Sequence, residues 1–331
     1  MSFSKRGSEA CPPNGLADTL IEAGYDQLFP SRSAHRVVHL EESPQLLRTP
    51  LCDLLGIDVP IIGAPFGPWH QVELAAAVCA AGGLGSVGSV PRPAEELREE
   101  WEMLRRLTDR PFAINYTGRS CDPEVFDAVL DFRPAVVTCH LADPAALIER
   151  AHAVGALWMQ LVMSIEQARR AVDLGADVII AQGAEAGGHG GGVPTTLLVP
   201  QVVDAAGVVP VVAAGGIADG RGLVAALAMG AQGVSMEMLR TPFLEYWAGR
   251  ADELGCCASE LGEELVAAIM AGNGQEDIPV AGLPMGRSGD VLPVGEIVRR
   301  SLVQAQDALA RLQTYRAMRC GLAHSSSGRH T

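Results

Sequence analysis

The chain alternates short apolar runs typical of strands with helix-like segments from residue 59 to residue 236. The predicted strands lie at 59–63, 84–88, 112–115, 135–139, 157–162, 178–181, 209–213 and 233–236. Helical patterns lie between them at 72–81, 94–107, 123–130, 144–154, 165–174, 197–206 and 220–229. Strict alternation predicts a parallel sheet covered by helices, and eight repeats is the number that closes a (β/α)8 (TIM) barrel. An open doubly wound sheet remains the alternative, because periodicity does not fix closure.

The segments around the repeats suggest additions to this barrel. Helical periodicity at 245–270 and 294–312 is separated by a glycine- and proline-rich segment that either covers a barrel mouth or forms a plain surface loop. The predicted organisation is an N-terminal extension (1–50), the barrel (51–245), a helical segment packing on or near it (246–322) and a polar, disordered tail (323–331).

One loop concentrates residues suited to catalysis. Residues 182–192 read QGAEAGGHGGG and follow an apolar strand. Glycine allows backbone N–H groups to approach a ligand closely, and His189 is the group there that can move a proton near neutral pH. The alternative is a mobile linker with an exposed histidine. We interpret Glu185 as an anchor that accepts backbone hydrogen bonds, in preference to a proton-transfer role.

A second glycine cluster lies two predicted elements further on. A β-branched run ends at Gly215 and Gly216, after which Asp219 can cap a helix that stops at Gly230. A short strand at 233–236 follows. In a closed parallel barrel, these two successive strand ends direct backbone amides toward the usual phosphate site.

A third cluster, GGLGSVG at 82–88, contains the letters of a dinucleotide-binding fingerprint. That fingerprint requires a strand before it and a helix after it. Here the preceding residues 72–81 are helical, and the following residues 86–90 are typical of a strand. We therefore expect a helix C-terminus leading into a buried strand.

The composition of the chain argues against several classes of binding partner. A net charge of −14 argues against nucleic acid and anionic membranes. We find no apolar run of transmembrane length and no signal-peptide core, and the eight cysteines lack metal-type pair spacing. We expect a reduced, cytoplasmic protein without a metal site.

Two motifs together resemble a known family. QGAEAGGHGG, followed by PVVAAGGIADGRGLVAALAMGAQGV, is similar to the nitronate monooxygenases (formerly 2-nitropropane dioxygenases) and their relatives, the FMN-dependent enoyl reductases. The resemblance extends over residues 60–236 through PIIGAP, AGGLGSVG and PFAINY. It implies an FMN-containing barrel with His189 as the catalytic residue. We also expect His140, which ends the fourth predicted strand, and Phe66, in the first loop, near the substrate. The residues that the resemblance places at the flavin are Ala64, Pro65, Asn115, Gln182, Gly187, Gly188, Gly215, Gly216, Ser235, Met236, Glu237 and Met238.

The resemblance also implies a reaction. A nitroalkane or its nitronate is oxidised by flavin and O2 to a carbonyl compound and nitrite, with His189 suited to remove the α-proton of the neutral substrate. Amides at Gly216 and in the strand 8 turn would hold the FMN phosphate. The chain departs from the family pattern at Glu237 and Met238, where relatives have glycine and threonine, and at Gly63 and Phe66 in the first loop.

Three hypotheses for the function follow. The chain is an FMN-dependent oxygenase of a nitronate or similar small carbanion, an FMN-dependent, NAD(P)H-consuming reductase of an enoyl thioester or quinone, or a non-catalytic ligand- or partner-binding barrel. His140 fits a substrate contact or a structural role equally well. The partners expected are a small-molecule substrate, O2 and, for the reductase, NAD(P)H, and a homodimer is left open.

Overall fold

The computed structural model describes residues 47–65, 71–89, 92–118, 123–140, 143–187, 192–236 and 292–325. The chain divides into two units, Met1–Leu40 and Glu41–Thr331, and all described residues belong to the second. The segment 246–291 lies outside the described residues. So does the predicted N-terminal extension (1–50), apart from residues 47–50.

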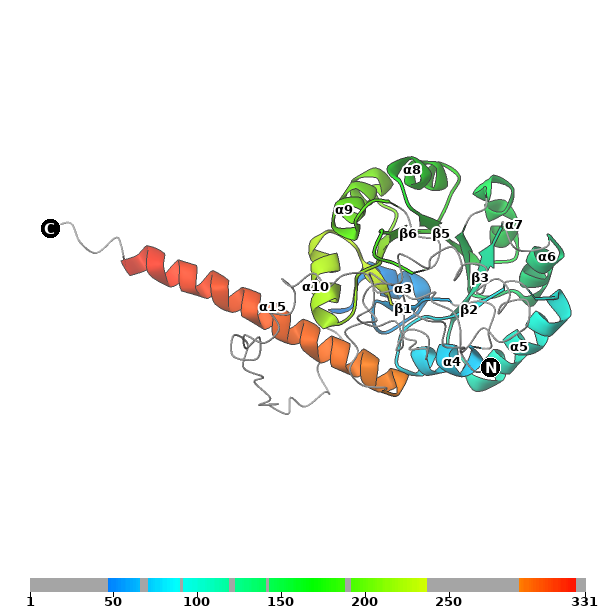
Figure 1. Cartoon of the computed structure of the whole chain (residues 1–331), viewed down its shortest axis with the longest axis horizontal. Coiled ribbons are helices and arrows are strands. Elements are labelled where there is room, and N and C mark those ends of the chain that lie inside the picture. The colour runs from blue at the N-terminus through cyan, green and yellow to red at the C-terminus, as the bar shows by residue number, and fades with distance from the viewer. Residues whose placement is uncertain are drawn as a thin grey trace, which may run out of the picture. The chain divides into compact units, whose positions relative to one another are not determined.

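Eight parallel strands form one sheet in the order β1-β8-β7-β6-β5-β4-β3-β2. A parallel bridge between Ile62 and Leu84 joins the two outermost strands, with the Gly63 N–H donating to the Leu84 carbonyl at 2.9 Å. The sheet therefore closes, which confirms the (β/α)8 barrel and excludes the open sheet (Figure 1). The strands are β1 (Ile61–Gly63), β2 (Gly85–Gly88), β3 (Phe112–Thr117), β4 (Val136–His140), β5 (Leu157–Val162), β6 (Val178–Gln182), β7 (Val211–Ala214) and β8 (Gly233–Met236).

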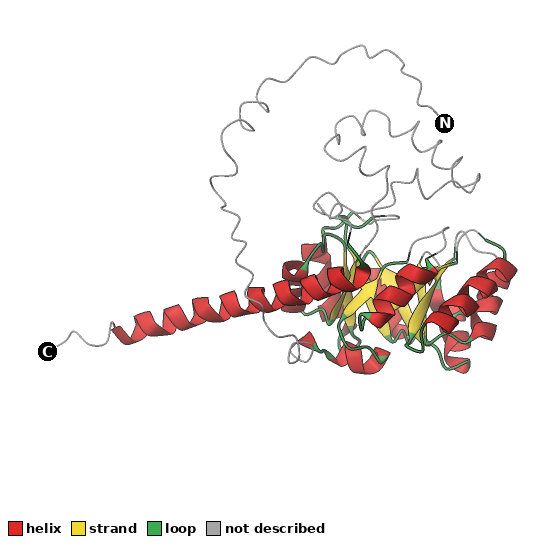
Figure 2. Ribbon diagram, turned by 90° about the horizontal axis from the view of Figure 1, so that it is seen from below, coloured by secondary structure: helices red, strands yellow, loops and turns green. Residues whose placement is uncertain are grey.

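Helices surround the strands (Figure 2). They are α4 (Val72–Ala80), α5 (Ala94–Leu107), α6 (Pro123–Phe132), α7 (Ile148–Ala153), α8 (Ile165–Asp173), α9 (Thr195–Ala206) and α10 (Gly220–Ala228). The single helix predicted at 144–154 is wrong, because a 3-10 turn, η3 (Pro144–Ala146), precedes α7. Asp143 caps this turn by accepting from the Ala145 N–H, and α-helical bonding begins only with the Ala151 N–H donating to Leu147.

Side chains on alternate strand positions form two separate layers. One set packs between strands and helices around Trp101, Phe126 and Trp158. The other set fills the barrel interior together with residues of the short helix α3 (Pro50–Leu55). The interior strand residues are Ile62, Leu84, Ala113, Val136, Met159, Val178, Ile180, Val212 and Ala214. The part of the barrel interior nearest to α3 is thus apolar.

The third glycine cluster behaves as expected. Helix α4 ends at Ala80, Gly82 has a φ of +89°, and β2 is buried throughout. A Cβ on Gly85 would lie 2.2 Å from the carbonyl oxygen of Ala75, so this glycine allows α4 to pack directly on β2. The cluster serves helix–strand packing, which confirms that it is no dinucleotide fingerprint.

A long helix, α15 (Val294–Ser325), comes after residues 237–291, which the structure does not describe. Its first half packs on α10 and α4 through buried Val298, Ser301 and Ala305, whereas Leu312 and Tyr315 are exposed. The helix continues past the predicted end at 312 and into 323–325, so the predicted start of a disordered tail is wrong. Alanine, leucine, methionine and arginine, all strong helix formers, continue the helix there. Among the described residues, no helix is long and apolar enough to cross a membrane.

Candidate functional site

Polar side chains face the barrel interior at the carboxyl ends of the strands. All but Ser235 lie two or four residues beyond an apolar residue of the interior set, so the alternation of side chains directs them inward as well. Ser235 lies between Val234 and Met236, which belong to the layer that packs against the helices, so its side chain takes the opposite, inward direction. The set comprises Ser86, Asn115, Thr117, Thr138, His140, Gln182 and Ser235. The structure thus brings together four residues singled out from sequence, Asn115, His140, Gln182 and Ser235, from four different strands.

Asn115 is held in place by hydroxyl groups. Its Nδ2 donates to Thr117 Oγ1 at 3.1 Å, and its Oδ1 accepts from Thr138 Oγ1 at 3.0 Å. Ser89 Oγ donates to the Asn115 carbonyl at 2.6 Å. A primary amide offers two N–H donors and two lone pairs, so each end of this side chain keeps one for a ligand.

Sequence reasoning missed these hydroxyls. Thr117 lies two residues beyond Asn115 on β3, a spacing that places both side chains on one face. Thr138 is the register partner of Asn115 on β4. The first contact could have been inferred from spacing, whereas the second depends on strand register.

His140 and Gln182 end β4 and β6 and are 9% and 8% exposed, respectively. Both side chains lie on the inward-facing positions of their strands. They contribute an imidazole and an amide to the polar end of the barrel, next to the Asn115 network. This position is compatible with both roles considered for His140.

The turn after β7 has the backbone geometry of an anion site. Gly215 and Gly216 have φ angles of +99° and +71°, a region that favours glycine. A Cβ on Gly215 would lie 2.9 Å from both the Ala186 nitrogen and Thr195 Oγ1. Between described residues, neither glycine N–H donates a backbone hydrogen bond outside the regular elements. The parallel pairing of Ala214 with Ser235 engages the Gly215 N–H in the β7–β8 ladder, so the Gly216 N–H is the amide of this turn that can face a ligand.

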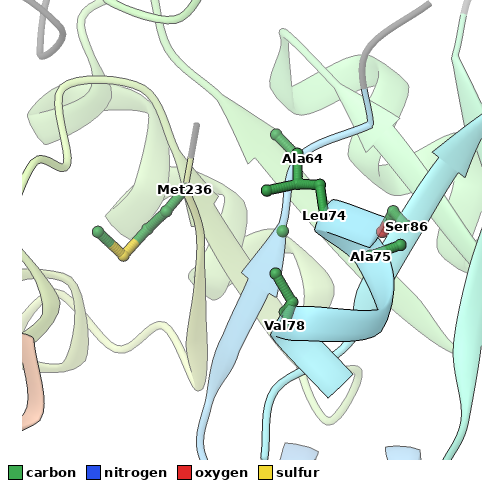
Figure 3. Close-up of a pocket in the computed structure, with 7 residues that line it drawn as sticks. Ala64, Leu74, Ala75, Val78, Ser86 and Met236 are labelled. Atoms are coloured by element: carbon green, nitrogen blue, oxygen red, sulfur yellow. The ribbon is translucent and has the colours of Figure 1, made fainter. Parts of the chain in front are cut away.

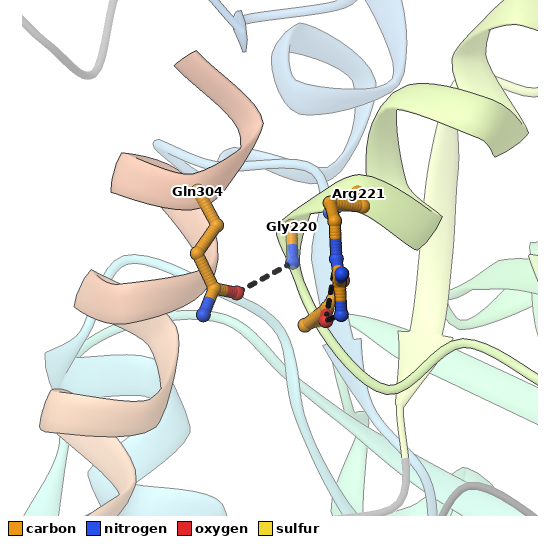
Figure 4. A network of polar contacts seen from close by, with 4 residues as sticks. Gly220, Arg221 and Gln304 are labelled. Atoms are coloured by element: carbon orange, nitrogen blue, oxygen red, sulfur yellow. Dashed lines mark hydrogen bonds and ion pairs between the residues drawn. The ribbon is translucent and has the colours of Figure 1, made fainter. Parts of the chain in front are cut away.

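The N-terminus of α10, by contrast, is already capped by side chains (Figure 4). The Gly220 N–H donates to Gln304 Oε1 at 3.2 Å, and the Arg221 N–H donates to Asp219 Oδ1 at 2.9 Å, which confirms the predicted Asp219 cap. Burial acts to raise the pKa of Asp219, but hydrogen bonds from Arg221 outweigh it and hold that pKa below its usual range. An anion here would meet an ionised carboxylate, so the preceding glycine turn is the better site.

Glu185 anchors the glycine loop, as predicted. Its Oε2 accepts from the Thr195 N–H at 2.8 Å and from Thr195 Oγ1 at 2.7 Å, at the start of α9. Burial acts to raise the pKa of Glu185, but these bonds outweigh it and lower the pKa. The Ala184 N–H also donates to the Val193 carbonyl at 2.9 Å. Residues on both sides of the segment 188–191 are therefore tied together.

A small hollow opens beside β1 and β2 (Figure 3). It encloses no space for a water molecule, so it is a shallow depression and not a ligand cavity. Its lining consists of Gly63, Ala64, Leu74, Ala75, Val78, Ser86 and Met236. The Ser86 hydroxyl is buried and has no hydrogen-bond partner among the described residues.

Several predicted site residues lie outside the described residues, namely Phe66, Gly188, His189, Glu237 and Met238. Their roles remain predictions. Pro65 and Gly187 are described at the ends of their segments. In the described ranges no cluster of His, Cys, Asp or Glu could hold a metal ion, and Cys52, Cys79 and Cys139 are buried free thiols.

Comparisons with known proteins show which family this chain is similar to. The sequence model of the family described as "Nitronate monooxygenase" matches residues 48–125 and 117–244, more than half of the chain. The Mycobacterium tuberculosis protein named (3aS,4S,5R,7aS)-5-hydroxy-7a-methyl-1-oxo-octahydro-1H-indene-4-carboxyl-CoA dehydrogenase is 40% identical over 193 residues, which cover 57% of this chain and 54% of that relative. A Pseudomonas aeruginosa nitronate monooxygenase is 35% identical over 231 residues, 55% of this chain and 66% of that relative.

The chain thus spans about half the length of the relatives that it matches at 40% identity. Among solved structures, FabK from Thermotoga maritima superposes with a TM-score of 0.69 at 30% identity, covering 81% of this chain and 99% of that chain. By the extent of the sequence match, this chain belongs to the nitronate monooxygenase family.

Proposed function

We propose that the chain is an FMN-dependent oxidoreductase acting on a carbon next to a strongly electron-withdrawing group. The observation that carries the proposal is the left-handed glycine turn at Gly215 and Gly216, beside inward-facing polar side chains at the same end of the barrel. When bound, FMN would take up electrons from the substrate and pass them to O2.

The residues present fit this cofactor. The turn at Gly215 and Gly216, with the Gly216 amide facing the ligand, would bind the phosphate without a cationic side chain. Asn115 and Gln182 would hydrogen-bond the polar edge of the ring, Asn115 through the donor and acceptor that its threonine partners leave open. Ser86, whose buried hydroxyl has no hydrogen-bond partner among the described residues, lies at the same end of the barrel.

The first candidate reaction is oxidation of a nitroalkane or its nitronate to a carbonyl compound and nitrite. The family membership supports it. In this reaction His189 would remove the α-proton of the neutral nitroalkane, while hydrogen bonds from the site would hold the nitro oxygens. A preformed nitronate has already lost that proton and needs no base.

The second candidate substrate is a coenzyme A thioester, whose carbonyl also acidifies the adjacent C–H bond. Its support is the 40% identity to relatives named as a carboxyl-CoA dehydrogenase. An NAD(P)H-dependent reduction of an enoyl thioester or quinone belongs to the same class of candidates.

Flavin content is the first test. The purified protein is denatured and its supernatant analysed, and we expect released FMN. FAD, or no flavin even after incubation with FMN, would contradict both enzymatic readings and leave the non-catalytic barrel. Nitrite release and O2 uptake with nitroalkanes, compared with acyl-CoA and NAD(P)H turnover, then separate the two candidates.

The variant His189→Asn tests the base. We expect it to slow turnover of a neutral nitroalkane by about 10²- to 10⁴-fold and to affect the preformed nitronate far less. Equal losses on both substrates would assign His189 to positioning. No effect on either substrate would remove it from the site.

A further inference from the structure

Helix α15 meets the start of α10 with no room for a side chain between them. A Cβ on Gly220 would lie 1.8 Å from the Ser301 carbonyl oxygen and 2.4 Å from the Ala305 nitrogen. Ser301 and Ala305 are themselves buried and small. The backbones of the two helices are therefore in direct contact at a seam formed by Gly220, Ser301 and Ala305.

A side chain of α15 also completes the cap of α10. Gln304 Oε1 accepts the Gly220 N–H at 3.2 Å, a contact between residues 84 positions apart in the sequence (Figure 4). Asp219 accepts the next N–H, that of Arg221. The neutral amide of Gln304 caps the helix without adding a second negative charge beside Asp219, whose own charge is matched by Arg221.

This seam lies at one end of the candidate phosphate turn. The turn begins at Gly215, where β7 ends, and finishes at Gly220, where α10 begins. The sheet fixes its first end, and α15 packs on its second end. Because two successive glycines leave the backbone between them unusually free, the shape of the turn depends on how its ends are held.

We propose that α15, through Ser301, Gln304 and Ala305, is a positioning element for the phosphate group bound at the turn of Gly215 and Gly216. This inference rests on the proposed FMN site and deepens it. It makes the C-terminal helix part of the cofactor site. Gln304 is a positioning residue, because it acts on the ligand through the Gly220 backbone.

The test compares FMN with riboflavin, which has the same ring but no phosphate. Dissociation constants for both are measured by fluorescence quenching on the full chain. Gln304→Met removes the acceptor at similar size, and Ala305→Leu forces the two helices apart. The matched controls, Gln313→Met and Ala310→Leu, alter exposed positions of the same helix.

We expect Gln304→Met to raise the Kd of FMN by about two- to tenfold, the range for one lost hydrogen bond, and Ala305→Leu to raise it at least as much. Riboflavin affinity should stay unchanged in both variants, and the controls should match the wild type. Equal weakening of both flavins would mean that α15 supports the barrel in general and would overturn the proposal. Unchanged FMN affinity in both variants would also overturn it, while leaving the FMN site standing. A wild type that binds neither flavin would refute the FMN site and this inference together.

Discussion

A buried ion pair links two segments at the carboxyl end of the barrel. Arg92 precedes α5 and pairs with Glu100 within it, and their side chains are only 12% and 1% exposed. Glu100 Oε1 also accepts the N–H of Gln71, the residue that precedes α4, at 3.1 Å. Two guanidinium nitrogens of Arg92, Nε and Nη1, are buried without a hydrogen-bond partner among the described residues. Glu100 is thus the counter-charge on which this buried cation depends.

The variant Glu100→Gln removes the charge and keeps an oxygen for the Gln71 N–H. Leaving a buried charge uncompensated costs about 3–5 kcal/mol. For a domain of this size, each kcal/mol lowers Tm by about 2–4 °C, so we expect a fall of about 6–20 °C. The control is Asp131→Asn, which breaks the ion pair with Arg98 at side chains that are 42% (Arg98) and 68% (Asp131) exposed. An exposed pair contributes only about 0–1 kcal/mol.

Thermal unfolding followed by circular dichroism at neutral pH gives the Tm of both variants. The double variant Arg92→Met/Glu100→Met should regain most of the stability lost in Glu100→Gln, because replacing a whole buried pair by apolar residues is often neutral. If Glu100→Gln costs no more than Asp131→Asn, the Arg92 charge is not buried as the structure has it. If the double variant is as unstable as the single one, the loss comes from packing and the electrostatic reasoning is refuted.

Two further predictions concern the glycine loop. A Cβ on Gly183 would lie 2.1 Å from Thr195 Oγ1, so Gly183→Ala should destabilise the fold by about 1–3 kcal/mol in urea, whereas Gly192→Ala, which meets nothing within 4 Å, should change it by less than about 0.5 kcal/mol. Equal effects would show that β6 and α9 do not approach closely. The lowered pKa of Glu185 means that its contacts stabilise the fold above the ordinary glutamate pKa of about 4.3 and that this contribution is lost as the pH falls below it. Unfolding measured from pH 7 to pH 3 should therefore show Glu185→Gln less stable than wild type at pH 7, with the difference shrinking in acid, and a difference that does not change with pH would contradict the role of this charge.

The sequence alone determined the order and type of the strands and helices and which residues end the strands. Strands at 157–162 and 233–236 and the helix at 94–107 have the predicted bounds. These patterns are local. A helix buried on one face repeats its apolar residues about every 3.6 positions, and a strand buried on both faces is a short continuous apolar run. Since parallel strands bring their carboxyl ends to one edge, Asn115, Gln182 and Ser235 could be placed together before any contact was known.

Tertiary structure decided what depends on register and on contacts between distant segments. Barrel closure required the pairing of Ile62 with Leu84, and the orientation of Asn115 required Thr138 from the next strand. Gln304 reaches Gly220 only because α15 packs back across α10. No local pattern encodes such a meeting, since the same helical periodicity would bury α15 against any apolar surface. The packing of the whole chain selects the partner.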